Sequence, residues 1–239
     1  MRQSAAARPW HPIPIVDCRE PLIPLPPQLL RLTPHPYGTL GAPYGDQQSP
    51  FLLRQGVVDR LLQAQDALQT LQPGWRLAIF DGWRPIAVQQ FMVTHTIQQL
   101  CVEQGVDAGV PSADLNRITA EVGRFWAPPS QDPATPPPHS TGAAVDLTLA
   151  DGTGLPLSMG GAIDAIGPVS EPDHYAQRAA AEPDGEAAGW NRNRQLLARV
   201  MAAAGFARHP NEWWHFSVGD QLWAWLSQAP SARYGRVDP

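Results

Sequence analysis

The sequence predicts an α+β fold built as a single domain. Segments with helical periodicity and short strand-like runs follow one another without the regular alternation of a βαβ protein. The chain has 239 residues, of which 43% are hydrophobic, enough for one sizeable core. A formal net charge of −5, with no basic run, gives no electrostatic reason to expect nucleic acid as a partner.

The first 50 residues are rich in proline and show no periodicity. Because proline fixes φ and removes a backbone donor, we expect residues 1–50 to form an extended arm packed on the domain formed by residues 51–239. The opening MRQSAAARPWHPIPIVD lacks the apolar core of a signal peptide, and no run of about eighteen apolar residues occurs. We therefore expect a cytoplasmic protein that has no membrane partner.

Apolar residues at spacings of three and four predict four helices after the arm. Pro85 suits the first turn of the second helix, and Pro73-Gly74 and Gly205 stop the first and the fourth. The four apolar stripes, in chain order, are Val57, Leu61, Ala64, Leu68 and Leu71; Ile86, Val93, Ile97 and Leu100; Leu115, Ile118, Val122 and Phe125; and Leu197, Val200, Met201 and Ala204.

Three runs are typical of strands: WRLAIFD at 75–81, AVDLTL at 144–149 and EWWHFSV at 212–218. Between 128 and 138, six of eleven residues are proline, which predicts an extended loop before the second strand. Residues 167–189 show no period and predict a long surface excursion that covers a site.

One strand contains an acid whose place is explained by the alternation of side chains. Val145 and its neighbours at 147 and 149 share the core face, so Asp146 points from the opposite face into a cleft. His139 lies seven residues earlier, where the proline-rich loop meets the strand. The small residues 142–144 between them leave room for a group to approach the backbone.

A second histidine and a second acid lie in the last strand, at His215 and Glu212. Together with His139 and Asp146, His215 would complete a set of three nitrogen and oxygen ligands. Such a set leaves one coordination position open, which is the pattern of a catalytic zinc site. Glu212 would then take a proton from a metal-activated water. Since positions i and i+3 of a regular strand face opposite ways, we predict an irregular backbone at residues 213–214, with one of these tryptophans in the core and the other walling the cleft.

The run DGWRP at 81–85 places Arg84 at a strand end, just before a helix. Its guanidinium could stabilise the oxyanion of a tetrahedral intermediate or bind a substrate carboxylate. Asp81 could bind a substrate ammonium or, alternatively, orient Arg84 through an ion pair.

Taken together, these runs resemble a known family. HSTGAAVD resembles the HxxGxAxD motif of the M15 zinc peptidases, and DGWRP and EWWHF narrow the resemblance to the VanX-like D-alanyl-D-alanine dipeptidases across residues 51–218. The resemblance implies an α+β fold with a central antiparallel sheet flanked by helices, and one Zn²⁺ per chain. It implies a small D,D-dipeptide substrate, zinc ligands at His139, Asp146 and His215, a general base at Glu212 and an oxyanion donor at Arg84.

The chain departs from the family pattern next to the first zinc histidine, where Pro137 stands in place of a frequent serine. A substrate contact made by that serine would be lost or replaced, for instance by Ser140 or Thr141. The candidate substrate contacts are therefore Asp81, Ser140 and Trp214. His174, in the excursion, is expected to be a surface or lid residue.

Two other functions compete with the dipeptidase. A D,D-carboxypeptidase or L,D-endopeptidase of the same superfamily would act on longer wall peptides, so an open groove would favour it and a compact cleft the dipeptidase. A non-catalytic zinc module would need a closed site, often built of cysteines, but Cys18 and Cys101 lie far from the motifs. Oligomeric state is left open, as is the biological role among wall recycling, nutrient use and glycopeptide resistance.

Overall fold

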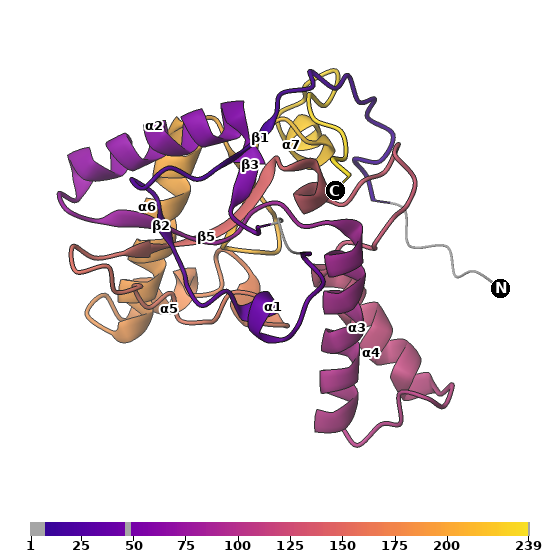
Figure 1. The fold of residues 1–239 in the computed structure, drawn as a ribbon. Coiled ribbons are helices and arrows are strands. Elements are labelled where there is room, and N and C mark those ends of the chain that lie inside the picture. The colour runs from indigo at the N-terminus through magenta and orange to yellow at the C-terminus, as the bar shows by residue number, and fades with distance from the viewer. Residues whose placement is uncertain (1–7, 46–48, 239) are drawn as a thin grey trace.

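The computed structural model describes residues 8–45 and 49–238, and it confirms an α+β fold (Figure 1). The helices are α1 (Pro36–Thr39), α2 (Gln55–Leu71), α3 (Ile86–Glu103), α4 (Ala113–Phe125), α5 (Ala176–Ala181), α6 (Glu186–Ala203) and α7 (Gln221–Leu226), with short 3₁₀ turns η1 (Pro138–Thr141) and η2 (Pro168–Ser170). The strands are β1 (Leu22–Pro24), β2 (Leu30–Arg31), β3 (Leu52–Arg54), β4 (Arg76–Asp81), β5 (Ala144–Ala150), β6 (Ala207–Arg208) and β7 (His215–Ser217).

The central sheet has five strands in the order β2-β4-β5-β7-β6. The pairs β4–β5, β5–β7 and β6–β7 are antiparallel, as the resemblance implies, while the edge strand β2 joins β4 in parallel. A second, two-stranded sheet pairs β1 with β3. Within the described ranges, no helix is both long and apolar enough to cross a membrane.

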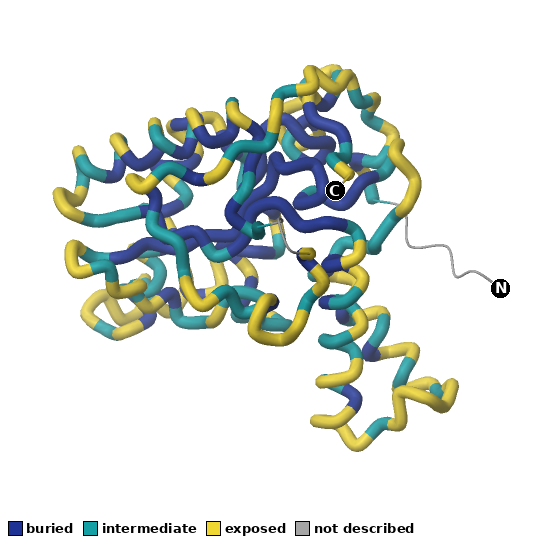
Figure 2. Tube along the Cα trace, viewed as in Figure 1, coloured by how far each residue is buried: buried dark blue, intermediate teal, exposed yellow. Residues whose placement is uncertain are grey.

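One face of the sheet carries the main core, and α2 and α6 cover it (Figure 1). Val145, Leu147 and Leu149 of β5 are fully buried against the apolar stripes predicted for these two helices. Figure 2 shows the buried stretches concentrated in the sheet and along the inner sides of these helices. On the opposite face of β5, Asp146 lines the cavity described below and Thr148 lines a separate one.

Helices α3 and α4 pack on each other and extend away from the sheet (Figure 1). The stripe predicted for α4 is confirmed, with Ile118 and Val122 buried. The stripe predicted for α3 was displaced: Val88 and Met92 form its buried side, and the predicted positions 93, 97 and 100 are half-buried. Because α3 has one helical neighbour along most of its length, burial does not extend over the whole predicted face.

The proline-rich arm is more regular than the sequence predicted. It contributes β1, β2 and α1, and it places Leu25 and Leu29 in the main core. Pro24 is tolerated in β1 because both strands of a two-stranded sheet are edge strands, where a missing N–H donor breaks no central ladder. The arm is therefore joined to the domain by sheet pairing as well as by surface packing.

The excursion at 167–189 is also more ordered than predicted. It contains η2 and α5, and α6 begins at Glu186, inside the segment expected to be irregular. Its alanines are good helix formers, which the absence of an apolar period concealed. His174 is exposed, as expected for a surface residue.

Gly142 ends η1 with a φ of 69°, and a Cβ built there would lie 2.3 Å from Leu22 Cδ2. We predict that Gly142→Ala lowers the free energy of unfolding by about 2 kcal/mol, mostly from backbone strain and to a smaller extent from the shift of the flexible Leu22 side chain. Gly105→Ala is the matched control, because its φ is 67° but the space around it is open. Urea unfolding measures both. Equal losses in the two variants would show that the contact with Leu22 costs nothing.

Candidate active site

Strand pairing assembles the centre of the site on the free face of β5. Asp146 lies directly opposite His215 of β7, so their side chains project from the same face. On its other side, β5 pairs with β4, where a register shift between Ile79 and Asp81 brings Asp81 opposite Asp146. Such a bulge turns Asp81 toward the site, where a regular ladder would have placed Phe80.

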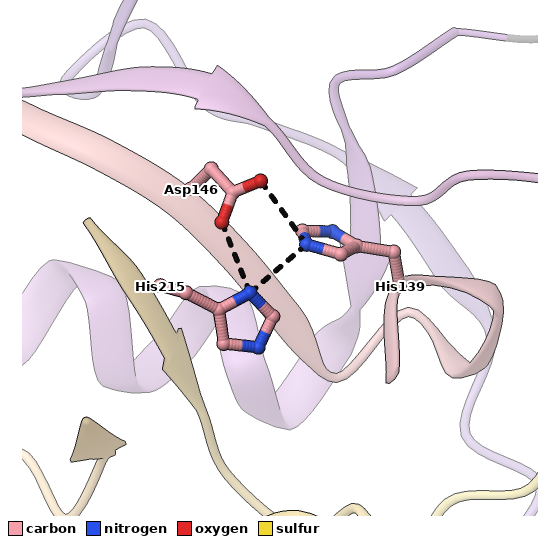
Figure 3. Close-up of side chains that lie close together, drawn as sticks. All are labelled: His139, Asp146 and His215. Carbon is pink, nitrogen blue, oxygen red and sulfur yellow. Dashed lines mark hydrogen bonds and ion pairs between the residues drawn. The ribbon is translucent and has the colours of Figure 1, made fainter. Parts of the chain in front are cut away.

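His139 joins this pair from η1, and the three side chains converge (Figure 3). His139 Nε2 lies 3.1 Å from Asp146 Oδ2 and 3.2 Å from His215 Nδ1, and His215 Nδ1 lies 3.0 Å from Asp146 Oδ1. All three residues are buried and form a group that could hold a metal ion. Ligands at 2.0–2.1 Å from a tetrahedral zinc stand about 3.3 Å apart, so this spacing fits zinc.

The orientation of His139 is set by a hydrogen bond behind the cluster. Its Nδ1 donates to the carbonyl oxygen of Gly82 at 2.7 Å, which leaves Nε2 as the nitrogen that faces Asp146 and His215. Such outer hydrogen bonds fix the tautomer and ring plane of metal-binding histidines. The donor set of two imidazoles and one carboxylate is also that of catalytic zinc sites with an open position.

Glu212 lies beside the cluster because the chain bends just before β7. Residues 213 and 214 form a bend, the Trp213 N–H donates to the carbonyl of Ser170, and the strand begins only at His215. The predicted irregular backbone is confirmed, and the predicted strand at 212–218 is shortened by it. Glu212 Oε2 lies 3.7 Å from His215 Nδ1, farther than the three clustered groups lie from one another.

Burial raises the pKa of the Glu212 carboxyl to about 8. The positive charge of His215 opposes this shift, while the negative charges of Asp146 and Asp164 add to it. A carboxyl with a pKa near neutrality is suited to accept and return a proton, and perturbed groups of this kind gather at functional sites. A cation held by the neighbouring cluster would favour the ionised form.

Arg84 is buried and held on several sides. Its Nε donates to Asp81 Oδ2 at 2.9 Å, its Nη1 to Gln89 Oε1 at 3.0 Å, and its Nη2 to Asp146 Oδ2 at 3.3 Å. Burial acts to raise the pKa of Asp81, but Arg84 and the neighbouring histidines outweigh it and keep that pKa below its usual range. Arg84 is thus a fixed cation that lines the cavity next to His139, Asp146 and His215.

Two of the expected substrate contacts do not reach the cavity. Asp81 is fully buried, pairs with Arg84 and accepts from the Tyr44 hydroxyl at 3.1 Å, so it orients the arginine and is not placed to bind an ammonium. Ser140 is also fully buried, and its hydroxyl donates to the Pro137 carbonyl at 2.8 Å. Trp213 and Trp214 are both core residues, and Trp214 additionally lines the cavity, as expected for one of the pair.

The cavity in front of the cluster has a volume of about 180 Å³. Pockets for drug-sized ligands occupy roughly 300–1,000 Å³, so this one suits a much smaller molecule. A compact cavity is the feature expected of a dipeptidase. Beyond the predicted residues, its lining includes Asp164, His209 and three residues of the arm: Arg8, Trp10 and His11.

Asp164 is a site residue that the sequence analysis missed. The Tyr37 hydroxyl donates to its Oδ2 at 2.6 Å, and burial, with Asp146 adding, raises its pKa to about 7. Its backbone has a φ of 65°, an uncommon value for a residue with a side chain. Asp164 stands between two apolar pairs, Ala162-Ile163 and Ala165-Ile166. An acid inside an apolar run is also the signal that singled out Asp146, so the sequence did contain a sign of this residue.

Comparison with known proteins agrees with this arrangement. The family model described as D-ala-D-ala dipeptidase, Peptidase M15, matches residues 32–232. A D-alanyl-D-alanine dipeptidase of Synechocystis is 45% identical over 244 residues, covering 97% of each chain. The Escherichia coli protein of that name is 39% identical over 174 residues, covering 72% of this chain and 69% of its own.

Among solved structures, VanYB in complex with D-alanine-D-alanine has a TM-score of 0.45 and 18% sequence identity, covering 78% of this chain and 83% of its own. The family assignment depends on the sequence matches, which extend over most of the chain. On these matches, the chain belongs to the D-Ala-D-Ala dipeptidase family of M15 peptidases.

Proposed function

We propose that this protein is a zinc-dependent dipeptidase that hydrolyses D-alanyl-D-alanine to two molecules of D-alanine. The observation that carries the proposal is the convergence of His139, Asp146 and His215 on one side of a small cavity that Glu212 and Arg84 also line. The names of the relatives agree with this substrate.

The three clustered residues would hold one zinc ion per chain, His139 through Nε2 and His215 through Nδ1. When bound, zinc supplies a Lewis acid that polarises the peptide carbonyl and lowers the pKa of a water molecule. Because the Gly82 carbonyl fixes the His139 ring, the ligand atoms need little rearrangement to bind the ion.

Glu212 acts as the general base in this proposal. Its carboxylate takes a proton from the attacking water and passes it to the nitrogen of the leaving D-alanine. The 3.7 Å separation from His215 Nδ1 keeps Glu212 beside the ligand set without making it part of the set. Positioned proton transfer of this kind contributes roughly 10²–10⁴-fold to rates.

Arg84 stabilises the oxyanion that develops when the carbonyl carbon becomes tetrahedral. Its guanidinium is already held by Asp81 and Gln89, so it need not reorganise during the reaction. Asp164, on the same cavity wall, supplies a carboxyl whose ionised form suits the free ammonium of the dipeptide. Trp214 gives an apolar wall for the small side chains.

The competing functions fit the cavity less well. A carboxypeptidase or endopeptidase for wall peptides needs room for a longer chain, which a cavity of about 180 Å³ does not offer. A structural zinc module has no use for a cavity next to the metal ligands, and neither cysteine lies there: Cys18 is exposed and Cys101 packs between α3 and α4.

We predict that the zinc-loaded protein releases D-alanine from D-Ala-D-Ala and that a chelator abolishes the release. Restoring zinc should restore turnover, because the ligand set is present without the ion. D-alanine is measured with a coupled oxidase assay. The control substrates are L-Ala-L-Ala and a tripeptide that lengthens D-Ala-D-Ala by one residue. Zinc-loaded protein that leaves D-Ala-D-Ala intact would disprove the proposed function.

A further inference from the structure

The N-terminal arm forms part of the cavity wall, although the family match begins only at residue 32. Beyond the wall, the arm is fixed along the C-terminal segment. The N–H groups of Val16 and Cys18 donate to the carbonyls of Ala232 and Arg233, both at 2.9 Å, and Ile15 forms a parallel bridge with Ala232. The first described residues of the arm are thereby held over the site.

The buried side chain of Gln221 joins the arm to the proline-rich loop, whose residues 135–138 also line the cavity. Gln221 Nε2 shares its two N–H donors among three carbonyl oxygens: those of His11 at 3.2 Å and Ile13 at 2.7 Å in the arm, and that of Ala134 at 3.0 Å in the proline-rich loop. Trp10 is buried, with its ring 6.3 Å from the His209 ring, and both residues line the cavity. The arm and the loop therefore close the cavity as one unit.

Arg8, at the start of this unit, is a half-buried cation that lines the cavity. Its Nη2 donates to the carbonyls of Gly123 and Trp126 at the end of α4, and these are the hydrogen bonds that its guanidinium makes to described residues. No carboxylate in the described ranges lies within 4.0 Å of it. Nε and Nη1 donate to no described residue, so they are free donors on a residue that lines the cavity.

The charges of the cavity lining suit the two ends of a dipeptide. Asp164 lies with Tyr37 near Arg84, and it supplies a negative charge for an ammonium. Arg84 itself is engaged by Asp81, Asp146 and Gln89. That leaves Arg8 as the cavity-lining arginine that has no carboxylate of the described chain within 4.0 Å, although the charge of Glu212 acts on it from farther away. At position 137, proline offers neither a hydroxyl nor a backbone N–H as a donor.

We propose that Arg8 is a substrate-positioning residue that binds the terminal carboxylate of the dipeptide, and that the arm carrying it makes the cavity selective for peptides that end there. This inference rests on the proposed dipeptidase function. Arginine is suited to the role because its planar fork binds a carboxylate through two N–H donors. In a longer peptide, the residue after the second alanine would clash with the arm, at the position that the terminal carboxylate of the dipeptide occupies.

A purely structural role for Arg8, as a cap on the last turn of α4, makes a different prediction. The Arg8 guanidinium donates to two carbonyls at that helix end, where cations are also favoured by the helix dipole. Arg124 lies in the same turn but is exposed and does not line the cavity. Arg124→Met therefore removes a cation from the same helix end and is the matched control.

The test compares D-Ala-D-Ala with its C-terminal amide, which lacks the carboxylate. We expect Arg8→Met to lower kcat/KM for the free acid by about 10- to 100-fold, mainly through KM, the range that corresponds to one lost charge-assisted contact. Turnover of the amide should change less than threefold, so the preference for the free acid disappears. Arg124→Met should keep that preference, and zinc content should be unchanged in both variants.

Calorimetry gives a second readout that needs no turnover: the affinity of D-Ala-D-Ala for the Glu212→Ala variant, with and without Arg8→Met. Adding Arg8→Met should weaken that affinity by about 10- to 100-fold. If Arg8→Met lowers the melting temperature, Arg8→Gln keeps an N–H donor for α4 and should show the same loss of preference. Equal losses on acid and amide, or an unchanged preference, would overturn the assignment of Arg8. Failure of the unmodified zinc enzyme on both substrates would instead refute the proposed function, and this inference with it.

Discussion

Replacing Glu212 with alanine is expected to lower kcat for D-Ala-D-Ala by about 10³-fold while one zinc ion per chain stays bound. The reason is geometric: the donor atoms of the three proposed ligands lie 3.0–3.2 Å from one another, whereas Glu212 Oε2 lies 3.7 Å from His215 Nδ1. Removing a group outside the ligand set takes away the proton acceptor and leaves the metal donors in place. Steady-state kinetics and elemental analysis of the same preparation measure the two effects.

The isosteric variant Glu212→Gln separates charge from shape. It fills the same buried space but accepts no proton, so it should lose turnover as far as the alanine variant does. Glu103→Gln, an exposed change near the end of α3, is the control and should leave kcat unchanged. Loss of zinc in Glu212→Ala would show that the glutamate is a ligand, and full turnover in Glu212→Gln would refute its role as base.

Replacing His139 with alanine is expected to abolish zinc binding and with it turnover. His139 supplies Nε2 to the cluster, and its Nδ1 hydrogen bond to Gly82 ties η1 to the end of β4. Two donors are left, which is too few for a tight zinc site. Because binding to the folded state stabilises it, zinc should raise the melting temperature of the unmodified protein and leave that of His139→Ala unchanged.

Comparing both proteins with and without zinc distinguishes loss of the metal from loss of packing. In the metal-free state, the difference in melting temperature reports the missing ring and its hydrogen bond, and the response to added zinc reports the ligand. His174→Ala, which removes an exposed histidine, should bind zinc and respond to it as the unmodified protein does. A normal zinc response in His139→Ala would remove His139 from the ligand set.

Much of the secondary structure could be predicted because its causes are local. The spacing of apolar residues marks α2, α4 and α6, and each buries the face that its stripe defines. Alternation along 144–149 correctly separates the core face of β5 from the face that carries Asp146. Because positions i and i+3 of a regular strand face opposite ways, the need to bring Glu212 and His215 to one site also predicts the bend at 213–214.

The arm and the excursion were predicted less well because the cause of their structure is not local. Proline content says which backbone angles are favoured, but it does not say that β2 finds a parallel partner in β4 or that β1 pairs with β3. Those pairings are set by the neighbours that the rest of the chain provides. Likewise, α5 has no buried residue of its own to create an apolar period.

By itself, the sequence determined which residue types can do the chemistry: two histidines and an aspartate as ligands, a glutamate and an arginine beside them, and the family to which the chain belongs. These residues lie in short motifs, and the spacing within each motif reflects the local turns that orient the side chains. Only the tertiary structure decided what surrounds them. It buried Asp81 and Ser140 behind the cavity wall, brought Asp164 into the cavity through a loop, and closed the cavity with Arg8 from more than 100 residues away in the chain. Packing between distant segments fixes these positions, and no short spacing in the sequence records it.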